Sequence, residues 1–476
     1  MPQNSQEILL MLPHVVIGVG IVISLLIEMY SKKSETILPW ISLFVFVFAG
    51  VHSIINISAN QILFGGMLEV GGKPAIFNFI FNIGAALLIL NSIDYIKKYE
   101  SNHGEYYILI QSAILGMMVM AGSKDIFMIF IGLELMSIAF YVLAGINKKK
   151  SSSNEAALKY FLLGAFATGF IVYGIALIYG VSSTTSVDSI IQNFSTFTQN
   201  ILFIVGLLLF IIGFSFKIAA FPFHMWVPDV YQGSATTVTG LMSTTGKTAA
   251  FSVLLIILSA SLINYNIDIF APYFAVIATL SMLYGSIVAI AQKNLKRMLA
   301  YSSISHAGYM AIGLAAANSE AFSGIIFYLA AYTFMNIGAF GIISIIEKQN
   351  DANTDLTAYA GLASKSPILA AFMSLFMFAL AGIPPLAGFF GKYYVFISAI
   401  EADLTWLAVV GVFSSVISVY FYLRLVVYMY FKESEKDIDL HIDKYSLLSV
   451  VVSGILVIYF GISPDSLLNL ILSVVN

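Results

Sequence analysis

The chain has 476 residues, of which 59% are hydrophobic and only 10% are charged, and its formal net charge at pH 7 is −3. Soluble globular domains are about 25% charged, so this composition excludes a soluble protein and predicts a chain that crosses a membrane many times. The sequence contains no cysteine, which excludes disulfide bonds, iron–sulfur ligation and thiolate metal sites on this chain. His, Asp and Glu show no spacing typical of a metal site either, and we expect no cofactor here.

Apolar runs of about 20 residues, the length that spans a bilayer, recur along the chain and predict an all-α polytopic membrane protein with 14 transmembrane helices. The N-terminal residues MPQNSQEILLMLPHVV lack the basic stretch and cleavage site of a signal peptide, so we expect them to begin the first helix. The expected ranges are 8–30, 37–57, 75–96, 105–122, 125–146, 156–180, 200–231, 234–260, 269–291, 295–316, 320–347, 366–400, 403–430 and 445–466.

The seventh and twelfth predicted helices are too long for one straight span, and both contain proline. The seventh includes Pro222 and Pro228, and the twelfth includes Pro384 and Pro385. Proline removes a backbone donor and clashes with the preceding turn, so we expect both helices to be broken or kinked.

The distribution of lysine and arginine predicts how the chain is oriented. Connections after odd-numbered helices are rich in them, as at Lys148, Lys149 and Lys150, whereas connections after even-numbered helices carry only Lys73 and Lys124. Cytoplasmic connections carry the excess of positive charge in membrane proteins. We therefore expect odd-numbered connections in the cytoplasm and both termini on the outer side.

A weak internal repeat relates the two broken helices, because FKIAAFPFHMW in the seventh resembles LAGIPPLAGFFGK in the twelfth. Five helices separate equivalent points, and an odd number reverses direction through the membrane, which is the pattern of an inverted repeat with sites near the bilayer midplane. We expect flanking helices 1–3 in 1–104, a first repeat of helices 4–8 in 105–260, a second of helices 9–13 in 269–430, and helix 14 in 445–476.

Glu134 and Lys217 are the first candidate site residues, because each lies within a predicted span. A charge at the bilayer centre costs roughly 2.5–3.5 kcal/mol on insertion scales, and ionisable residues there point to function. Glu134 is interpreted as a proton-carrying acid, with a structural carboxylate as the alternative. Lys217 lies about one turn before the Pro222 break, where freed carbonyls can solvate its ammonium. Desolvated lysine releases a proton readily, and the alternative is snorkelling to an interface.

Three further lysines fall within predicted spans. Lys247 lies in STTGKTAAF among hydroxyl side chains that can hold water or serve only helix packing. Lys392 follows the second break, in PPLAGFFGKYYVF, and is interpreted as the buried base of the second repeat. Lys159 lies nearer the cytoplasmic end of the sixth helix, so a proton-transfer role and snorkelling remain equally open for it.

Histidine titrates near physiological pH, so His224 and His306 are candidates for passing protons between lysines. His224 directly follows the Pro222 break, and a satisfied structural histidine is the alternative reading. His306 is a lesser candidate of the same kind. Arg424, within the thirteenth predicted helix, cannot deprotonate, so we interpret it as part of a structural ion pair or as a fixed charge.

At these residues the chain resembles subunit N of the bacterial proton-pumping NADH:quinone oxidoreductase, respiratory complex I, in the antiporter-like, Mrp-related family. The motifs are FPFHMWVPDVYQG, GLMSTTGKTAAF, QKNLKRMLAYSSISHAGYM and AGIPPLAGFFGKYYVF. Lys392 resembles subunits N and L, whereas subunit M typically has glutamate there. PDVYQG and the lysine of STTGK resemble N more than L, and the chain stops after helix fourteen without the long lateral helix of L. GSATTV departs from the family, which often has proline there, in a loop.

The resemblance implies that Glu134 is the helix-five acid paired with Lys217. It implies that Lys247 and Lys392 are the central and exit-side lysines, with Lys159 and His224 as connecting sites. Flavin and iron–sulfur clusters are expected on partner subunits of a peripheral arm, and neighbours of the M and K types in the bacterial inner membrane.

Two other functions share this fold and lysine pattern. One is a cation/proton antiporter subunit of the Mrp type, and the other is the membrane subunit of an energy-conserving hydrogenase. The motif PDVYQG and the length of fourteen helices favour the proton-translocating subunit of a quinone oxidoreductase, which is an enzyme only as part of its complex.

Overall fold

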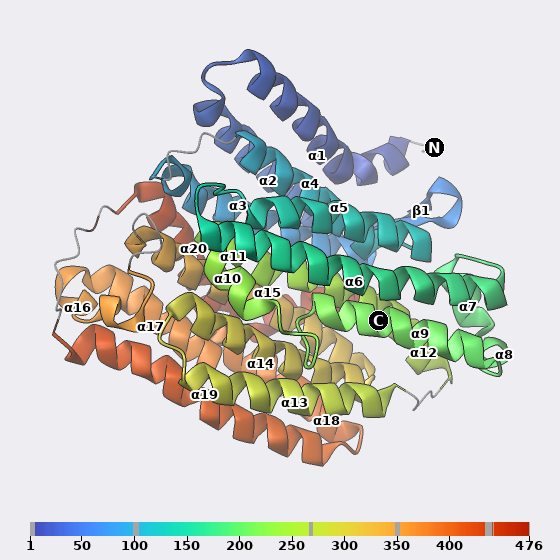
Figure 1. The fold of residues 1–476 in the computed structure, drawn as a ribbon. Helices are drawn as coiled ribbons and strands as arrows, with labels where there is room; N and C mark the ends of the chain where they lie inside the picture. The colour runs from blue at the N-terminus through green and yellow to red at the C-terminus, as the bar shows by residue number, and fades with distance from the viewer. Residues whose placement is uncertain are drawn as a thin grey trace.

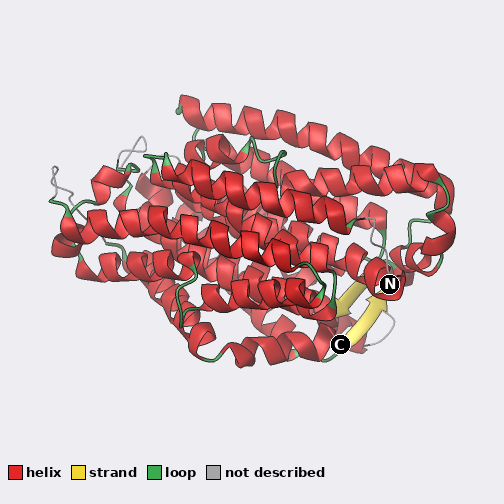
Figure 2. Ribbon diagram, turned by 90° about the horizontal axis from the view of Figure 1, so that it is seen from below, coloured by secondary structure: helices red, strands yellow, loops and turns green. Residues whose placement is uncertain are grey.

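The computed structural model describes residues 5–98, 104–265, 270–347, 353–433, 440 and 442–475. Within these residues the chain folds into one bundle of long helices, with a single two-stranded hairpin (Figures 1 and 2). Both views mark the two ends of the chain on the side of the bundle where the hairpin lies. The fold is therefore mostly helical, as the sequence predicts.

The N-terminal elements are α1 (Ser5–Tyr30), α2 (Ser34–Ile55), β1 (Asn60–Leu63), η1 (Phe64–Gly66), β2 (Leu68–Gly71), α3 (Gly72–Lys98), α4 (Gly104–Gly122), α5 (Ile126–Ala144), α6 (Ser151–Ser182), α7 (Val187–Gln192) and α8 (Phe194–Phe197). The central elements are α9 (Ile201–Lys217), α10 (Val227–Gly233), α11 (Thr236–Leu241), the π-helical turn η2 (Met242–Gly246), α12 (Lys247–Tyr265), α13 (Ala271–Ile290) and α14 (Leu295–Ala316). The C-terminal elements are α15 (Ser319–Ile346), η4 (Leu356–Tyr359), α16 (Leu362–Lys365), α17 (Pro367–Ala381), α18 (Ala387–Glu401), α19 (Thr405–Phe431), α20 (Lys444–Ile462) and α21 (Pro464–Val475).

Ten helices in the described part of the chain are long and apolar enough to cross a membrane, and α9, α17 and α21 are shorter apolar helices. Where the sequence predicts one helix over 445–466, the structure has α20 and then α21. Pro464 begins α21, and proline is well accommodated at the start of a helix because the donor it lacks has no partner there.

Both predicted breaks are confirmed. The seventh predicted helix divides into α9 and α10, and the twelfth divides into α17 and α18. Pro222 lies in the irregular segment, whereas Pro228 lies in the first turn of α10 and begins a helix instead of interrupting one. Side chains form hydrogen bonds with backbone groups at the break after α9. The Phe221 N–H donates to Ser281 Oγ (2.9 Å), and Trp226 Nε1 donates to the Phe216 carbonyl (3.2 Å).

Neighbouring helices approach closely where glycines face each other. A Cβ on Gly174 of α6 would lie 2.6 Å from the Gly206 carbonyl oxygen of α9, and one on Gly116 of α4 would lie 2.6 Å from the Gly132 carbonyl of α5. Such contacts leave no room for a side chain, and they let helices pack without a hydrophobic driving force from lipid. The pairs α4–α5 and α6–α9 therefore pack with their backbones in close approach.

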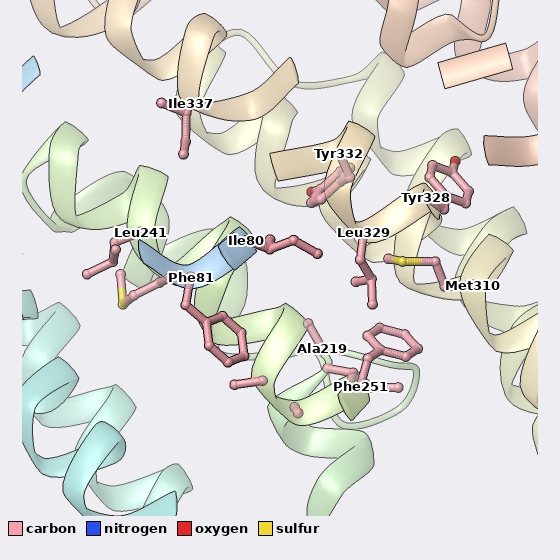
Figure 3. Close-up of a cluster of buried hydrophobic side chains, with 14 of the residues drawn as sticks. Ile80, Phe81, Ala219, Leu241, Phe251, Met310, Tyr328, Leu329, Tyr332 and Ile337 are labelled. Carbon is pink, nitrogen blue, oxygen red and sulfur yellow. The ribbon is translucent and has the colours of Figure 1, made fainter. Parts of the chain in front are cut away.

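The apolar core lies between α3, α12, α14 and α15, and α15 is buried along its length. Figure 3 shows Ile80 and Phe81 of α3, Phe251 of α12 and Leu329 of α15 facing one another, with Ala219 of the α9–α10 break beside them. Tyr328 and Tyr332 lie at the edge of this cluster. The polar residues of the middle helices are therefore surrounded by apolar side chains.

Candidate functional site

Lys217, Lys247 and Lys392 are confirmed as buried, with 6%, 2% and 5% of their surface exposed. Lysine is almost never fully buried unless it has a partner. Each ammonium has hydrogen-bond acceptors, and they are hydroxyls and carbonyls. These three residues are therefore solvated by the protein and not by water at its surface.

Lys217, the last residue of α9, points to one face of α5. Its ammonium donates to the Ser137 hydroxyl (2.9 Å) and to the Tyr141 hydroxyl (3.3 Å), and it lies 5.6 Å from the centre of the Tyr141 ring. Both acceptors are side-chain hydroxyls, so the expectation that carbonyls freed by the break hold this ammonium is not met in the described structure.

Glu134 lies one turn before Ser137 on the same helix and is half-buried. Its carboxylate accepts a hydrogen bond from Thr168 Oγ1 of α6 (2.8 Å). Among the described residues it forms no direct ion pair with Lys217, although the two charges interact electrostatically. The structure therefore brings the implied acid and lysine to one helix face, with the hydroxyl of Ser137 contacting the lysine.

Lys159 lies apart from this cluster, in an exposed ion-pair network near one end of the bundle. Its side chain is 41% exposed and pairs with Glu155 (2.6 Å) and Asp229 (2.8 Å), while Asp229 also pairs with Arg297 (2.6 Å). The network joins α6, α10 and α14. The aromatic ring of the next residue, Tyr160, does reach inward, with its centroid 4.9 Å from that of Tyr141.

Lys247 begins α12 directly after the π-helical turn η2. Its ammonium donates to the Ser303 carbonyl (2.6 Å) and the Ser303 hydroxyl (2.5 Å) of α14 and lies 5.7 Å from the centre of the Tyr332 ring. The neighbouring hydroxyls of Ser243 and Thr244 donate instead to the Gly240 carbonyl of their own helix. They satisfy backbone groups around the wide turn, which is the packing role left open by the sequence.

His306 occupies the space between Lys247 and Lys392. Its two ring nitrogens contact the Tyr328 hydroxyl (2.8 Å) and the Tyr422 hydroxyl (3.0 Å), and the charges of both lysines act on it. From the sequence, His306 is a lesser candidate than His224, because no local pattern reveals that α15 and α19 each place a tyrosine against His306. The surrounding YSSISHAGY segment, polar within a span, is the signal that marks it.

Lys392 lies on α18, one turn beyond the second break. Its ammonium donates to the Ala381 carbonyl (2.8 Å), which the break frees at the end of α17, and to Ser415 Oγ of α19 (2.7 Å). It also lies 4.8 Å from the centre of the Tyr309 ring. Here a carbonyl freed by a helix break does hold a lysine.

His224 is buried in the irregular segment between α9 and α10. Its ring stacks on Phe221 (5.3 Å between centroids) and contacts Tyr284 of α13 (4.6 Å), and its Nδ1 has no hydrogen-bond partner. A buried polar atom of this kind is normally satisfied by water. Within the described residues His224 does not contact any of the buried lysines.

Arg424 caps a helix. Its guanidinium donates to the Ile290 carbonyl (2.7 Å) and the Gln292 carbonyl (2.6 Å), where α13 ends. A cation is favourable at a helix C-terminus because the last carbonyls carry partial negative charge. The interpretation as a fixed charge fits this contact, and the described residues place no carboxylate in an ion pair with Arg424.

Lys73 and Lys124 line one cavity of about 240 Å³ near the hairpin, together with Glu69 and Asp188. Lys124 pairs with Glu69 (3.1 Å) and Asp188 (3.4 Å). Burial acts to lower the pKa of the Lys124 ammonium, but the carboxylates of Glu69 and Asp188 outweigh it and raise the pKa above its ordinary value. The two lysines assigned to the outer side thus lie together, at the end of the bundle where the chain termini lie.

No group of three or more His, Cys, Asp or Glu side chains in the described ranges is placed to hold a metal ion. The chemistry that the arrangement supports is proton transfer. Lysine and histidine can each exist with or without the proton, and the hydroxyls of Ser303, Tyr328 and Tyr422 can both donate and accept.

Three comparisons place the chain among known proteins. Residues 123–418 match the family described as "NADH:quinone oxidoreductase/Mrp antiporter, TM". The chain is 43% identical to NADH-quinone oxidoreductase subunit N of Trichlorobacter lovleyi over 462 residues, 96% of this chain and 95% of the relative. It superposes with a TM-score of 0.83 on a chain of respiratory complex I from Thermus thermophilus, at 31% identity over 96% of this chain and 98% of that one. A chain of the Mrp complex from Dietzia sp. DQ12-45-1b shares the fold, with a TM-score of 0.88 at 17% identity over 98% of this chain and 97% of that one.

Proposed function

The chain belongs to the family of NADH-quinone oxidoreductase subunit N, antiporter-like membrane subunits of respiratory complex I, and we propose that it translocates protons within such a complex, coupled to quinone reduction. The observation that carries the proposal is the series of buried ammonium groups at Lys217, Lys247 and Lys392. Each is held by hydroxyl or carbonyl groups of the protein. Lysine loses a proton when desolvated, whereas arginine does not. A path built from lysines can therefore release what it binds.

The path that we propose runs through the middle of the bundle. Glu134 sets the proton affinity of Lys217 by its charge, and Lys247 is the central site. His306 passes protons from Lys247 to Lys392 through its contacts with Tyr328 and Tyr422. Lys159 belongs to the cytoplasmic end, and His224, with water at its free Nδ1, serves as a side branch near the first break.

We further propose that the bundle contains 14 spans arranged as two inverted units, 105–260 and 269–430, with 1–104 and 445–476 flanking them. The matching breaks after α9 and α17 support this division. The shared position of Lys73, Lys124 and the chain ends supports an outer, periplasmic location of both termini in the bacterial inner membrane. Neighbours of the M and K types and a peripheral arm with flavin and iron–sulfur clusters complete this translocase, and this chain holds no redox centre.

Proton pumping by the reconstituted complex tests the proposal. Lys247→Met or Lys392→Met should reduce the rate of proton pumping by about 100-fold, the low end of the range for a lost acid–base group. NADH oxidation by the peripheral arm with an artificial acceptor should remain normal. Lys97→Met is the matched control, because the Lys97 side chain is 52% exposed at the end of α3. Full pumping by assembled complexes with either buried lysine replaced would refute the path.

The Mrp-type antiporter and the hydrogenase subunit share the fold, but likeness at 17% identity speaks only to the fold. Co-purification separates them from the proposed function. The native complex should contain flavin and oxidise NADH, and a complex without both would exclude the assignment to a quinone oxidoreductase.

A further inference from the structure

One lysine–carboxylate pair within the described residues is completely buried. Lys296 is the second residue of α14, and Glu347 directly follows the end of α15. Both side chains have 0% exposure, and Lys296 Nζ lies 3.6 Å from Glu347 Oε1. Lys296 lies at the start of a helix, where a lysine is usually exposed, yet it is buried here. A buried pair of opposite charges needs a reason, because hydrophobic residues of similar volume are often as stable.

The pair is bound to the turn where α11 begins. Lys296 Nζ donates to the Ser234 carbonyl (3.0 Å), and the Glu347 carboxylate accepts from the Thr236 hydroxyl and from the Tyr95 hydroxyl (3.0 Å) of α3. The Thr236 N–H in turn donates to the Tyr95 oxygen (2.9 Å). Hydrogen bonds to ionised groups are about twice as strong as neutral ones. The two charges therefore hold Ser234, which caps the end of α10, and Thr236, the first residue of α11.

The same two helices meet again at Lys247. Helix α11 continues through η2 directly into Lys247, and α14 carries Ser303 seven residues after Lys296, about 10 Å along the helix axis at 1.5 Å per residue. Ser303 supplies both acceptors of the Lys247 ammonium. The ion pair thus joins α11 to α14 and α15 at one end, and the contact between Lys247 and Ser303 joins them deeper in the bundle.

Arg297, the next residue after Lys296, points the other way. Its guanidinium binds Asp229 and contacts Gln232 (3.3 Å) of α10, and its side chain is 30% exposed. The turn between α10 and α11 therefore lies between an exposed network and a buried one. Solvent and salt weaken the exposed network. The buried pair is shielded from both, so it holds the turn between α10 and α11 at low and at high salt concentration.

We propose that Lys296 and Glu347 are positioning residues for Lys247, which hold the helix that bears this lysine in register with its acceptor Ser303. The inference rests on the proposed function of Lys247 in proton transfer. The pair does not carry protons itself. Replacing Lys296 removes its contact with the Ser234 carbonyl, and replacing Glu347 weakens its contacts with Thr236 and Tyr95, so either change releases the start of α11.

The experiment compares Lys296→Met, Glu347→Gln and the double variant in the intact complex, reconstituted into vesicles. Each single variant should lower the rate of proton pumping by up to about 100-fold, the cost of a displacement of about 1 Å at a reacting group. The double variant should be no more defective than the worse single variant, because both residues hold the same turn and their effects are not additive. Normal pumping by both single variants overturns the proposal, and so does a double variant whose defect is the product of the two single defects, since the residues would then act independently.

Two further variants keep the result interpretable. If the single variants do not assemble, Thr236→Val removes only the hydroxyl that Glu347 binds, and unchanged pumping by it would count against positioning. Lys247→Met is measured in parallel as the reference. Normal pumping by Lys247→Met refutes the proposed function itself, whereas a defective Lys247→Met beside normal Lys296 and Glu347 variants refutes only the positioning role.

Discussion

In the first proposed unit the buried ammonium of Lys217 lies at the end of α9, before the helix break, whereas in the second the ammonium of Lys392 lies on α18, after the break. Lys217 is held by two hydroxyls of α5, and Lys392 is held by the freed Ala381 carbonyl and a hydroxyl of α19. Similar breaks in similar sequences are therefore used differently. Lys217 precedes the first break and is held by hydroxyls of another helix, whereas the second break supplies a carbonyl that accepts a hydrogen bond from Lys392.

The partners of the two lysines differ in charge as well. Glu134 gives the first unit an acid on the helix face that Lys217 contacts, while the corresponding helix of the second unit, α14, presents His306 and Tyr309. An acid stabilises a proton on its neighbouring lysine, and a histidine can accept that proton. The buried lysines of the two proposed units therefore face groups of different charge.

Arginine substitutions test whether both lysines must release a proton. Lys217→Arg and Lys392→Arg keep the charge but cannot deprotonate, so each should reduce pumping by about 1,000-fold, within the range for a lost acid–base group. The measurement is proton uptake by vesicles with NADH oxidation recorded in parallel. Normal pumping by one of the two variants would show that this lysine serves only as a fixed charge, and the two lysines would then have different roles.

His306→Gln tests the histidine of the second unit. Glutamine keeps a donor and an acceptor for Tyr328 and Tyr422 but does not titrate, and pumping should fall by about 100-fold. His224→Gln is the matched control, because His224 does not contact a buried lysine among the described residues. A smaller loss in His306→Gln than in His224→Gln would reverse the roles that the contacts assign.

Glu134→Gln tests the acid of the first unit. The amide keeps the hydrogen bond from Thr168 and removes only the charge. Pumping should fall by about tenfold, the equivalent of about 1.4 kcal/mol. The loss should be smaller at pH values low enough to keep Lys217 protonated without its acid. A loss that is the same at every pH would show that Glu134 does not act through its charge.

The two breaks also differ in backbone strain, which predicts the smallest effect. Gly382 at the second break has φ +88°, and a Cβ there would lie 3.0 Å from Lys392 Cδ, whereas the first break has Ala219 at φ +65°. Gly382→Ala should lower stability by about 1–2 kcal/mol, the cost of a left-handed non-glycine residue. Ala219→Gly should instead raise it, because glycine adopts the left-handed conformation without this cost. Thermal unfolding of the purified complex measures both, and equal effects would contradict the expected difference.

Much of the fold follows from residues whose effect is local. Pro222, Pro384 and Pro385 predict the two breaks because proline removes a backbone donor and clashes with the preceding turn. Lys217, Lys247 and Lys392 are recognisable as buried because apolar residues flank them on both sides for several turns. These inferences need only the chemistry of one segment.

The parts that the sequence misses depend on other helices. Lys296 lies at a helix end beside Arg297 and reads as a surface charge, and only the packing of α3, α11 and α15 around it shows that it is buried. Lys159 reads as part of a span, yet its partner Asp229 lies 70 residues away and draws it to an exposed network. His306 likewise gains its role from Tyr422, which is 116 residues distant in the chain.

The hydroxyl-lined surroundings of Lys247, His306 and Lys392 have a consequence for how many protons these three groups can hold together. No carboxylate contacts these three groups among the described residues, so each bound proton adds a full positive charge to a region enclosed by apolar side chains. Two like charges about 10 Å apart repel by roughly 2 kcal/mol at an effective dielectric constant of 20. In the proposed path, a proton on one of these groups therefore disfavours a proton on the next.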